Sequence, residues 1–406
     1  MIARAERAGL SIERAFTPRN FAIAGIVLAV IGFWVVLPPL TQRSILWPIF
    51  FGILGIFCGI AAVTRGVRRL GWSAVVLGLA SIGLGILATR SSVGHLDSVV
   101  VWSALFASML RYATPLAFAA IGGMFSERSG VVNIALEGMM LAGAFFGILA
   151  AQKSGSWAFG LLAAMIAGAA LALIHAFFSI HLRADQIVSG TAINFLALGV
   201  TGYFFIDVYG ELGTPSDIPR IPDVHISLDK IPGGLGNFLD EVFGQLNLMI
   251  WLSFLLLIVS YIVMFKTPIG LRIRSVGEHP RAADTVGINV YLIRYASVTV
   301  SGILAALGGA YLSIGFLGSF NEGMTGGRGF IALAALIFGA WRPFGAYSAC
   351  LLFGFSYALA QRLPEYSGSA ATLFLALPYV LTLIAVAGVI GRSIPPAAVG
   401  RPYRKQ

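Results

Sequence analysis

The sequence predicts an all-α polytopic membrane protein with about 12 transmembrane segments. Apolar residues make up 58% of the 406 residues and charged residues only 11%, whereas about 25% of the residues in a soluble domain are charged. Apolar stretches of about 18 residues or more, long enough to cross a bilayer, recur along the chain. Lys and Arg gather in alternate connections between these stretches, as in loops that stay in the cytoplasm. The net charge of +10 therefore indicates membrane topology rather than nucleic-acid binding.

The predicted spans differ in polar content along the chain. The first three are rich in Ile, Leu, Val and Gly, and we interpret residues 1–92 as an accessory region of packing helices. Polar content rises after residue 97, so residues 93–406 are expected to form the functional core. The segment 329–341 is short for a full crossing, which predicts a half-helix or a re-entrant element. In chain order, the predicted spans are 21–40, 45–63, 73–89, 98–122, 131–151, 157–180, 187–206, 248–265, 295–315, 329–341, 344–361 and 372–391.

Pairs of small residues recur in the core spans at a spacing that puts both on one helix face. Such pairs let two helix backbones approach closely inside a membrane. We therefore expect close helix crossings at Gly143/Gly147, Ala164/Gly168 and Ala305/Gly309.

Loop charges predict the orientation in the membrane. The loop 266–294 and the tail after residue 391 are rich in Lys and Arg, which places them and both termini in the cytoplasm. Most of the charged residues in the long loop 207–247 are acidic, so this loop is predicted to lie outside. Its four prolines predict an ordered cap with turns. The first apolar segment lacks a small-residue cleavage site, so we expect it to remain as a span.

The segment 126–138, SERSGVVNIALEG, concentrates polar residues beside the membrane. Asn133 and Glu137 are costly in such a place, which marks them as candidates for a substrate path. Gly130 and Gly138 bracket the run and predict a broken helix, as found around transporter substrate sites. The alternative is an interfacial turn in which Glu127 and Arg128 pair among lipid headgroups.

A second glycine cluster, Gly326 to Ala332, opens a short apolar helix. We include Gly327 and Arg328 among the path candidates, with a tight extracytoplasmic turn as the alternative. Thr191 and Asn194 in the span 187–206 complete the set, because hydroxyl and amide groups suit a polar, uncharged substrate.

The loop 266–294 contains one short predicted helix, from Pro280 to Val286. His279 would be its N-cap, Pro280 suits the first helical position, and Gly287 suits a left-handed C-cap. Ala282, Ala283 and Val286 would share a face and present a small, flat plug to a cytoplasmic partner. An ordinary solvated loop is the alternative.

Signatures of an enzyme are missing from the sequence. It contains no Gly-Lys dipeptide and hence no phosphate-binding loop of the G-x-x-x-x-G-K-[ST] type. The five histidines are scattered without metal-ligand spacing, so no metal site or catalytic residue is predicted. His175, deep in a span, is interpreted as a helix-contact residue. Cys58 and Cys350 lie inside apolar spans and indicate neither a disulfide framework nor a redox motif.

Four segments of the chain resemble one family. They are SERSGVVNIALEGMMLAGAF, the loop SVGEHPRAADTVGINV followed by SGILAALGGAY, GGRGFIALAALIFGAWRPFGA, and LPYVLTLIAVAGVIGRSIPPAAVGRPY. In this order they resemble permease subunits of bacterial ABC importers of the nucleoside and simple-sugar group, which are related to the ribose and branched-chain amino-acid permeases. The resemblance spans roughly residues 98–404. The three N-terminal spans are not part of it.

The resemblance implies a multi-subunit importer in the bacterial inner membrane. This chain would form the translocation path with a second homologous permease, a cytoplasmic ATP-binding subunit would hydrolyse ATP, and an extracytoplasmic lipoprotein would deliver substrate. This chain would bind no cofactor and would not be an enzyme. Its loop would be the ATPase-coupling loop, with Gly277, Glu278, Pro280, Ala282, Ala283 and Gly287 in contact with the ATPase. The path would include Asn133, Glu137, Thr191, Asn194, Gly327 and Arg328.

The C-terminal segment is most similar to the nucleoside branch of this group. A simple sugar or riboflavin is the alternative substrate. An ion-coupled secondary transporter would need a buried carboxylate acting alone, and Glu137 is its only candidate. A membrane-embedded enzyme is disfavoured by the missing catalytic cluster.

Overall fold

A computed structural model of the chain describes residues 17–35, 44–90, 101–215, 217–227, 234–362 and 394–405. It divides into two compact units, one of residues 1–105 with 356–392 and one of residues 106–355 with 393–406. Eight helices in the described residues are long and apolar enough to cross a membrane. The predicted helical membrane class is confirmed, whereas the number of about 12 spans stays a prediction. The predicted span 372–391 lies outside the described residues.

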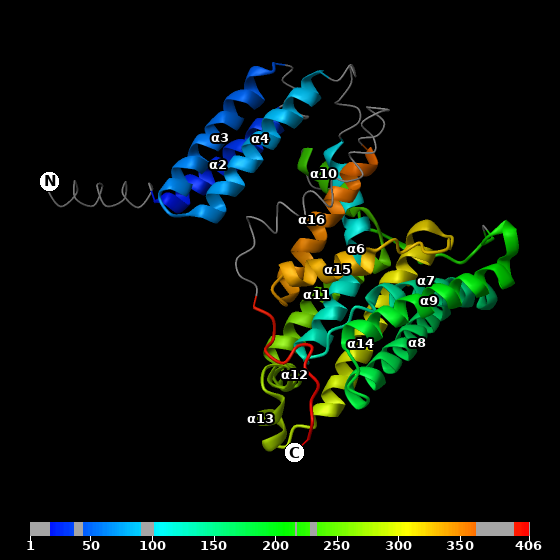
Figure 1. Ribbon diagram of the computed structural model, residues 1–406. Coiled ribbons are helices and arrows are strands. Elements are labelled where there is room, and N and C mark those ends of the chain that lie inside the picture. The colour runs from blue at the N-terminus through cyan, green and yellow to red at the C-terminus, as the bar shows by residue number, and fades with distance from the viewer. Residues whose placement is uncertain are drawn as a thin grey trace. The chain divides into compact units, whose positions relative to one another are not determined.

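In the first unit, three N-terminal helices pack on one another: α2 (Pro18–Trp34), α3 (Leu46–Thr64) and α4 (Arg68–Arg90) (Figure 1). Glycines line their crossings. A Cβ on Gly59 would lie 2.7 Å from the Gly71 carbonyl oxygen, and a Cβ on Gly25 would lie 2.8 Å from that of Gly55. The helices therefore touch backbone to backbone, while Phe57 and other large apolar side chains point outward.

The second unit is built around two helices that cross each other closely. They are α7 (Leu136–Ser154) and α14 (Val290–Ala310), and the latter continues as a π-helix, η3 (Tyr311–Leu317). Around them lie most of α6 (Trp102–Arg128), α8 (Trp157–Ala176) with its π-helical end η1 (Phe177–His181), α9 (Gln186–Tyr209), α11 (Leu248–Lys266) and the first part of α16 (Pro343–Arg362). The predicted boundaries were wrong by several residues at 98–122, 131–151 and 295–315, where the spans are 102–128, 136–154 and 290–317.

The predicted small-residue crossings are confirmed in this unit. A Cβ on Gly309 would overlap the carbonyl oxygen of Met140, and one on Gly143 would overlap the carbonyl of Ala306. Gly168 meets Gly302 in the same way. Helix α14 thus lies against both α7 and α8 at a separation that only glycine permits at these positions.

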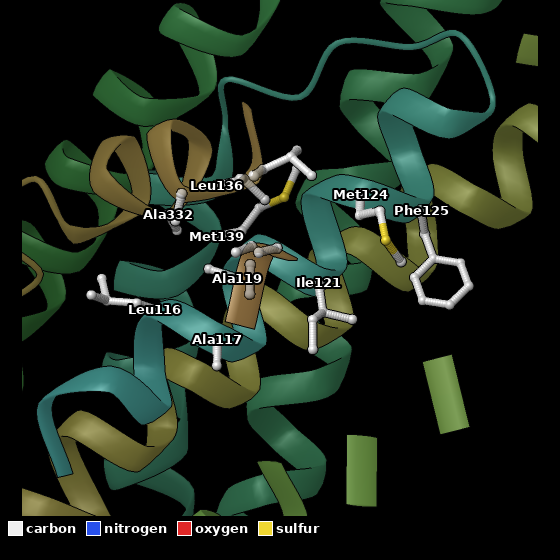
Figure 2. Close-up of a cluster of buried hydrophobic side chains, with 14 of the residues drawn as sticks. Leu116, Ala117, Ala119, Ile121, Met124, Phe125, Leu136, Met139 and Ala332 are labelled. Carbon is white, nitrogen blue, oxygen red and sulfur yellow. The ribbon is translucent and has the colours of Figure 1, made fainter. Parts of the chain in front are cut away.

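A hydrophobic cluster joins α6 to the starts of two other helices (Figure 2). Leu116, Ile121 and Met124 of α6 are fully buried in it. Leu136 and Met139 come from the first turns of α7, and Ala332 comes from α15 (Arg328–Phe338). The segment predicted as a half-helix or re-entrant element forms α15, a helix of 11 residues that begins at Arg328, and its course in the membrane stays a prediction. This packing fixes the places where α7 and α15 begin.

The loop 207–247 is ordered in its described parts, as the prolines predicted. It contains η2 (Gly210–Leu212), β1 (Asp223–His225), α10 (Gly234–Phe243) and β2 (Gln245–Asn247). The strands pair antiparallel, with Asp223 opposite Asn247. The amide Nδ2 of Asn247 donates to the carbonyl oxygens of Ile221 (2.9 Å) and Gly315 (3.3 Å). The small sheet is therefore attached to the end of η3.

Candidate functional site

The chain between α6 and α7, residues 129–135, is a break between two helices, as the glycine spacing predicted. Gly130 has a φ of +94°, in the left-handed region that favours glycine. The Ser126 hydroxyl donates to the carbonyl of Val131 at 2.7 Å and closes the turn. The second predicted bracket is wrong: Gly138 lies inside α7, where its missing side chain lets Asn194 of α9 approach.

Side chains from other helices form hydrogen bonds with the backbone groups of the break that have no partner within a helix. The Val132 N–H donates to Gln186 Oε1 at 2.7 Å, and the Val132 carbonyl lies 2.9 Å from His175 Nε2. The other ring nitrogen of His175 lies 3.1 Å from the Ser189 hydroxyl. His175 is therefore a helix-contact residue, as predicted. Buried backbone groups without partners would be costly inside a membrane, which explains why these polar residues stand here.

Asn133 lies in the break and is fully buried. Its Nδ2 donates to the Ser301 hydroxyl on α14 at 2.9 Å, and its Oδ1 accepts the N–H of Ala135 at 3.1 Å. Asn194 meets the same region from α9. Its Oδ1 accepts the N–H of Gly138 at 2.8 Å, and its Nδ2 donates to the carbonyl of Ile134 at 3.0 Å. Both amides thus hold the start of α7.

Glu137, in the first turn of α7, binds the start of α15. Its Oε1 accepts the Thr325 hydroxyl at 2.5 Å and the Gly327 N–H at 2.8 Å. Its Oε2 accepts the Gly329 N–H at 2.6 Å. A carboxylate is favourable at the positive N-terminal end of a helix. The starts of α7 and α15 are therefore tied together by one side chain.

We call Asn133, Glu137, Asn194, Thr325 and Gly327 the helix-start cluster. Three of its members were predicted from the glycine-bracketed segment and the α9 span, and Gly327 came from the second glycine cluster. Thr325 was missed, although its place directly before Gly326 and Gly327 was a usable signal.

The remaining path candidates lie beside this cluster. Arg328 Nη1 donates to the carbonyls of Met324 (2.9 Å) and Thr325 (3.1 Å) in its own turn. Thr191 is exposed on α9, three residues before Asn194, and its hydroxyl donates to the Ile187 carbonyl at 2.8 Å. The structure therefore gathers five of the six candidates around the starts of α7 and α15, with Thr191 on the adjoining helix face.

Glu127 and Arg128 form no headgroup-exposed pair, so that alternative is wrong. Glu127 is buried, and its Oε2 accepts the indole N–H of Trp341 at 2.5 Å. Arg128 Nε donates to the Trp341 carbonyl at 2.9 Å. Both residues fasten the end of α6 to the turn between α15 and α16, where Ala340 and Trp341 have positive φ.

The predicted coupling loop forms two helices, α12 (Pro268–Glu278) and α13 (Pro280–Thr285). His279 is the N-cap residue, Pro280 begins the helix, and Gly287 has a φ of +84°, all as predicted. The helix ends one residue earlier than expected.

The predicted contact face of α13 was wrong in one residue. Ala283 is 3% exposed and packs inside the chain against Val276, Val290 and Tyr403. Ala282 and Val286 remain exposed. The sequence could not indicate this, because Tyr403 reaches α13 from the C-terminal segment. Gly277 is also buried, since a Cβ there would overlap the Arg128 carbonyl, whereas Glu278 is exposed and its Oε2 accepts the Ala397 N–H at 3.2 Å.

The described residues contain no group of three His, Cys, Asp or Glu that could hold a metal ion.

Residues 105–386 match the model of a family described as branched-chain amino acid transport system / permease component. The chain belongs to this permease family. The resemblance noted in the sequence is confirmed, and the protein is a multi-pass membrane permease, a component without catalytic activity of its own.

Several relatives align with most of this permease. The guanosine ABC transporter permease protein NupQ of Bacillus subtilis is 46% identical over 326 residues, which cover 76% of this chain and 99% of the relative. The nucleoside ABC transporter permease protein NupC of Lactococcus lactis is 41% identical over 311 residues (74% and 96%). The putative glucose ABC transporter permease protein TsgC13 of Haloferax volcanii is 35% identical over 258 residues (64% and 77%).

Two more distant matches, 25% and 22% identical, are further guanosine and nucleoside ABC transporter permease proteins from the same two bacteria. Each of these bacteria thus has two related permeases. No solved structure matches the chain.

Proposed function

We propose that this permease is the membrane subunit of an ATP-driven importer of nucleosides. The observation that carries the proposal is its 46% identity to a guanosine permease over nearly the whole of that relative. A relative named as a putative glucose permease is less similar, at 35% identity. A sugar is therefore the weaker candidate.

The helix-start cluster supports a path for an uncharged substrate. The Glu137 carboxylate accepts three hydrogen bonds and neutralises the start of α15, so this helix end offers no unpaired positive dipole to an anionic substrate. Thr191 and Asn194 line the adjoining face of α9. The same bonds disfavour an ion-coupled transporter, because that mechanism needs a carboxylate that is alone.

The other subunits follow from the family. We infer a second homologous permease, a cytoplasmic ATP-binding subunit that uses the ATP, and an extracytoplasmic substrate-binding lipoprotein. The paired permeases in two bacteria support a pair of unlike permeases here. This chain itself would bind no cofactor.

Reconstitution tests the function. The two permeases, the ATP-binding subunit and the lipoprotein are reconstituted in liposomes. Uptake of guanosine, adenosine, uridine, riboflavin and ribose is then measured with and without ATP on the side of the ATP-binding subunit. We expect ATP-dependent uptake of nucleosides alone. Uptake of ribose or riboflavin in preference to nucleosides would show that the proposed substrate is wrong. Nucleoside uptake driven by an ion gradient without ATP would overturn the proposed mechanism.

The orientation is proposed from the loop charges. Both termini and the loop 266–294 are expected in the cytoplasm of a bacterial cell, and the loop 207–247 outside. Single cysteines at the exposed residues His225 and Ala282 allow a test in intact cells with a membrane-impermeant maleimide. Labelling at 225 but not at 282 is expected, and the reverse pattern would invert the topology.

Docking of the ATP-binding subunit is proposed to use the exposed face of α13. The adjacent alanines differ in burial and so make a matched pair. Ala282→Glu places a charge in a contact that excludes water, which costs several kcal/mol. We expect folded permease that no longer copurifies with the ATP-binding subunit. Ala283→Glu is expected instead to lower the thermal stability of the permease itself, because Ala283 is buried in its own chain. If the Ala282→Glu permease still copurified normally with the ATP-binding subunit, α13 would not be its docking site.

A further inference from the structure

The C-terminal segment 394–405, which we call the strap, runs along α12, α13 and the break between α6 and α7 (Figure 1). Its Ala398 N–H donates to the Gly277 carbonyl on α12 at 2.9 Å, and its Gly400 N–H donates to the Gly130 carbonyl in the break at 3.3 Å. Two residues of one turn in the strap therefore bond to two elements that are far apart in the sequence.

A buried arginine holds the strap from the side of α14. Arg294 is 1% exposed, and its Nη1 donates to the Arg401 carbonyl at 3.2 Å. Its Nη2 would lie 2.9 Å from a Cβ on Gly130, so the guanidinium fills the corner between the break and the strap. Removing a charged donor from such a site leaves a buried carbonyl without its partner.

The far end of the strap is fastened by an aromatic side chain. Tyr403 is buried with Val276, Ala283 and Val290, and its ring centroid lies 5.6 Å from that of Tyr291. Burial, together with the hydrogen bond to Asp284, raises the pKa of Tyr403 to about 12. A helix of six residues such as α13 is not stable alone. Contacts with α12 and α14 hold it in place, and Tyr403 adds its link to the strap.

The break reached by the strap leads to the helix-start cluster. Asn133 is the third residue after Gly130 along the chain, and Glu137 stands one turn further on. Gly277 also rests directly on the end of α6, at the Arg128 carbonyl. The helix α12 and the strap therefore contact residues 128–130 through backbone atoms.

We propose that the strap makes α12, α13 and the α6–α7 break one moving body, so that motion imposed on α13 by the ATP-binding subunit reaches the helix-start cluster. This rests on the proposed importer function and extends it to a segment outside the coupling loop. The strap acts as a positioning element: it contacts neither ATP nor substrate.

Uptake per ATP hydrolysed in reconstituted complete transporter tests the strap. Ala398→Pro removes the N–H that binds Gly277, and Tyr403→Ala removes the anchor under α13. Both should keep the ATP-binding subunit bound and hydrolysing, while guanosine uptake per ATP falls about five- to tenfold, within the usual range of coupling factors. Rates are expressed per assembled complex, so the yield of folded protein does not enter. Arg404→Gln and Lys405→Gln, exposed on the same segment, serve as controls with an unchanged ratio.

Three results would overturn the proposed role of the strap. The first is an unchanged ratio in both variants. The second is loss of the ATP-binding subunit with normal coupling in the complexes that remain, which would make the segment a docking surface. The third is a larger fall in uptake per ATP for Arg404→Gln and Lys405→Gln than for the two test variants, which would indicate that the basic residues of the strap anchor it to the membrane. Absent ATP-driven uptake in the unaltered complex would instead count against the importer function.

Discussion

Glu137→Leu is expected to abolish uptake and to lower the thermal stability of the purified permease. The substitution leaves the Thr325 hydroxyl and the N–H groups of Gly327 and Gly329 without their acceptor. An unsatisfied buried donor costs about 1–3 kcal/mol, so the loss of three bonds is worth about 3 kcal/mol or more. The start of α15 would then separate from α7. Unfolding in detergent and reconstituted guanosine uptake measure the two effects.

Glu137→Gln and Glu322→Gln complete this test. The glutamine keeps one acceptor oxygen and should lose only part of the stability and uptake. Glu322 is exposed in the connection before α15 and should tolerate the change. Wild-type stability and uptake in Glu137→Leu would show that the two helix starts need no tie.

Gly309→Ala is the second change with a large expected effect. The added Cβ would overlap the carbonyl oxygen of Met140, so α14 and α7 would have to separate. Overpacking of this kind costs about 1–3 kcal/mol. Because α7 and α14 both also pack on α8, the loss should appear as reduced thermal stability and as weaker assembly with the partner permease.

Gly199→Ala is the matched control on α9. A Cβ there meets no atom within 4 Å, and alanine is better than glycine in a helix by roughly 0.5–1 kcal/mol. This variant should be as stable as the original chain or slightly more so. Equal behaviour of the two variants would mean that the α7–α14 crossing adapts without cost.

The sequence was sufficient where one local rule decided the structure. Gly287 was recognised because a helix that begins with Pro280 ends most readily at a left-handed glycine. The short α15 followed from the length of its apolar run. The small-residue pairs identified the crossing of α7 and α14 because no other residue type fits there.

It was insufficient where distant parts of the chain meet. Glu137 was a candidate because a carboxylate is costly in a membrane, but its partners stand nearly two hundred positions away, in the turn before α15. Ala283 was assigned to an outer face because nothing local indicates Tyr403. Helix periodicity gives the faces of a helix but not which segment covers them.

The π-helical end of α14 has a mechanical consequence. The carbonyls of Ile314 and Gly315 in η3 accept the Ile221 N–H (3.1 Å) and the Asn247 amide, so the small sheet hangs from this end. At the other end of the same span, Arg294 grips the strap. The span has 28 residues, and its 21 α-helical residues alone are about 32 Å long at 1.5 Å per residue. One continuous helical span therefore connects the small sheet at one end with the strap at the other.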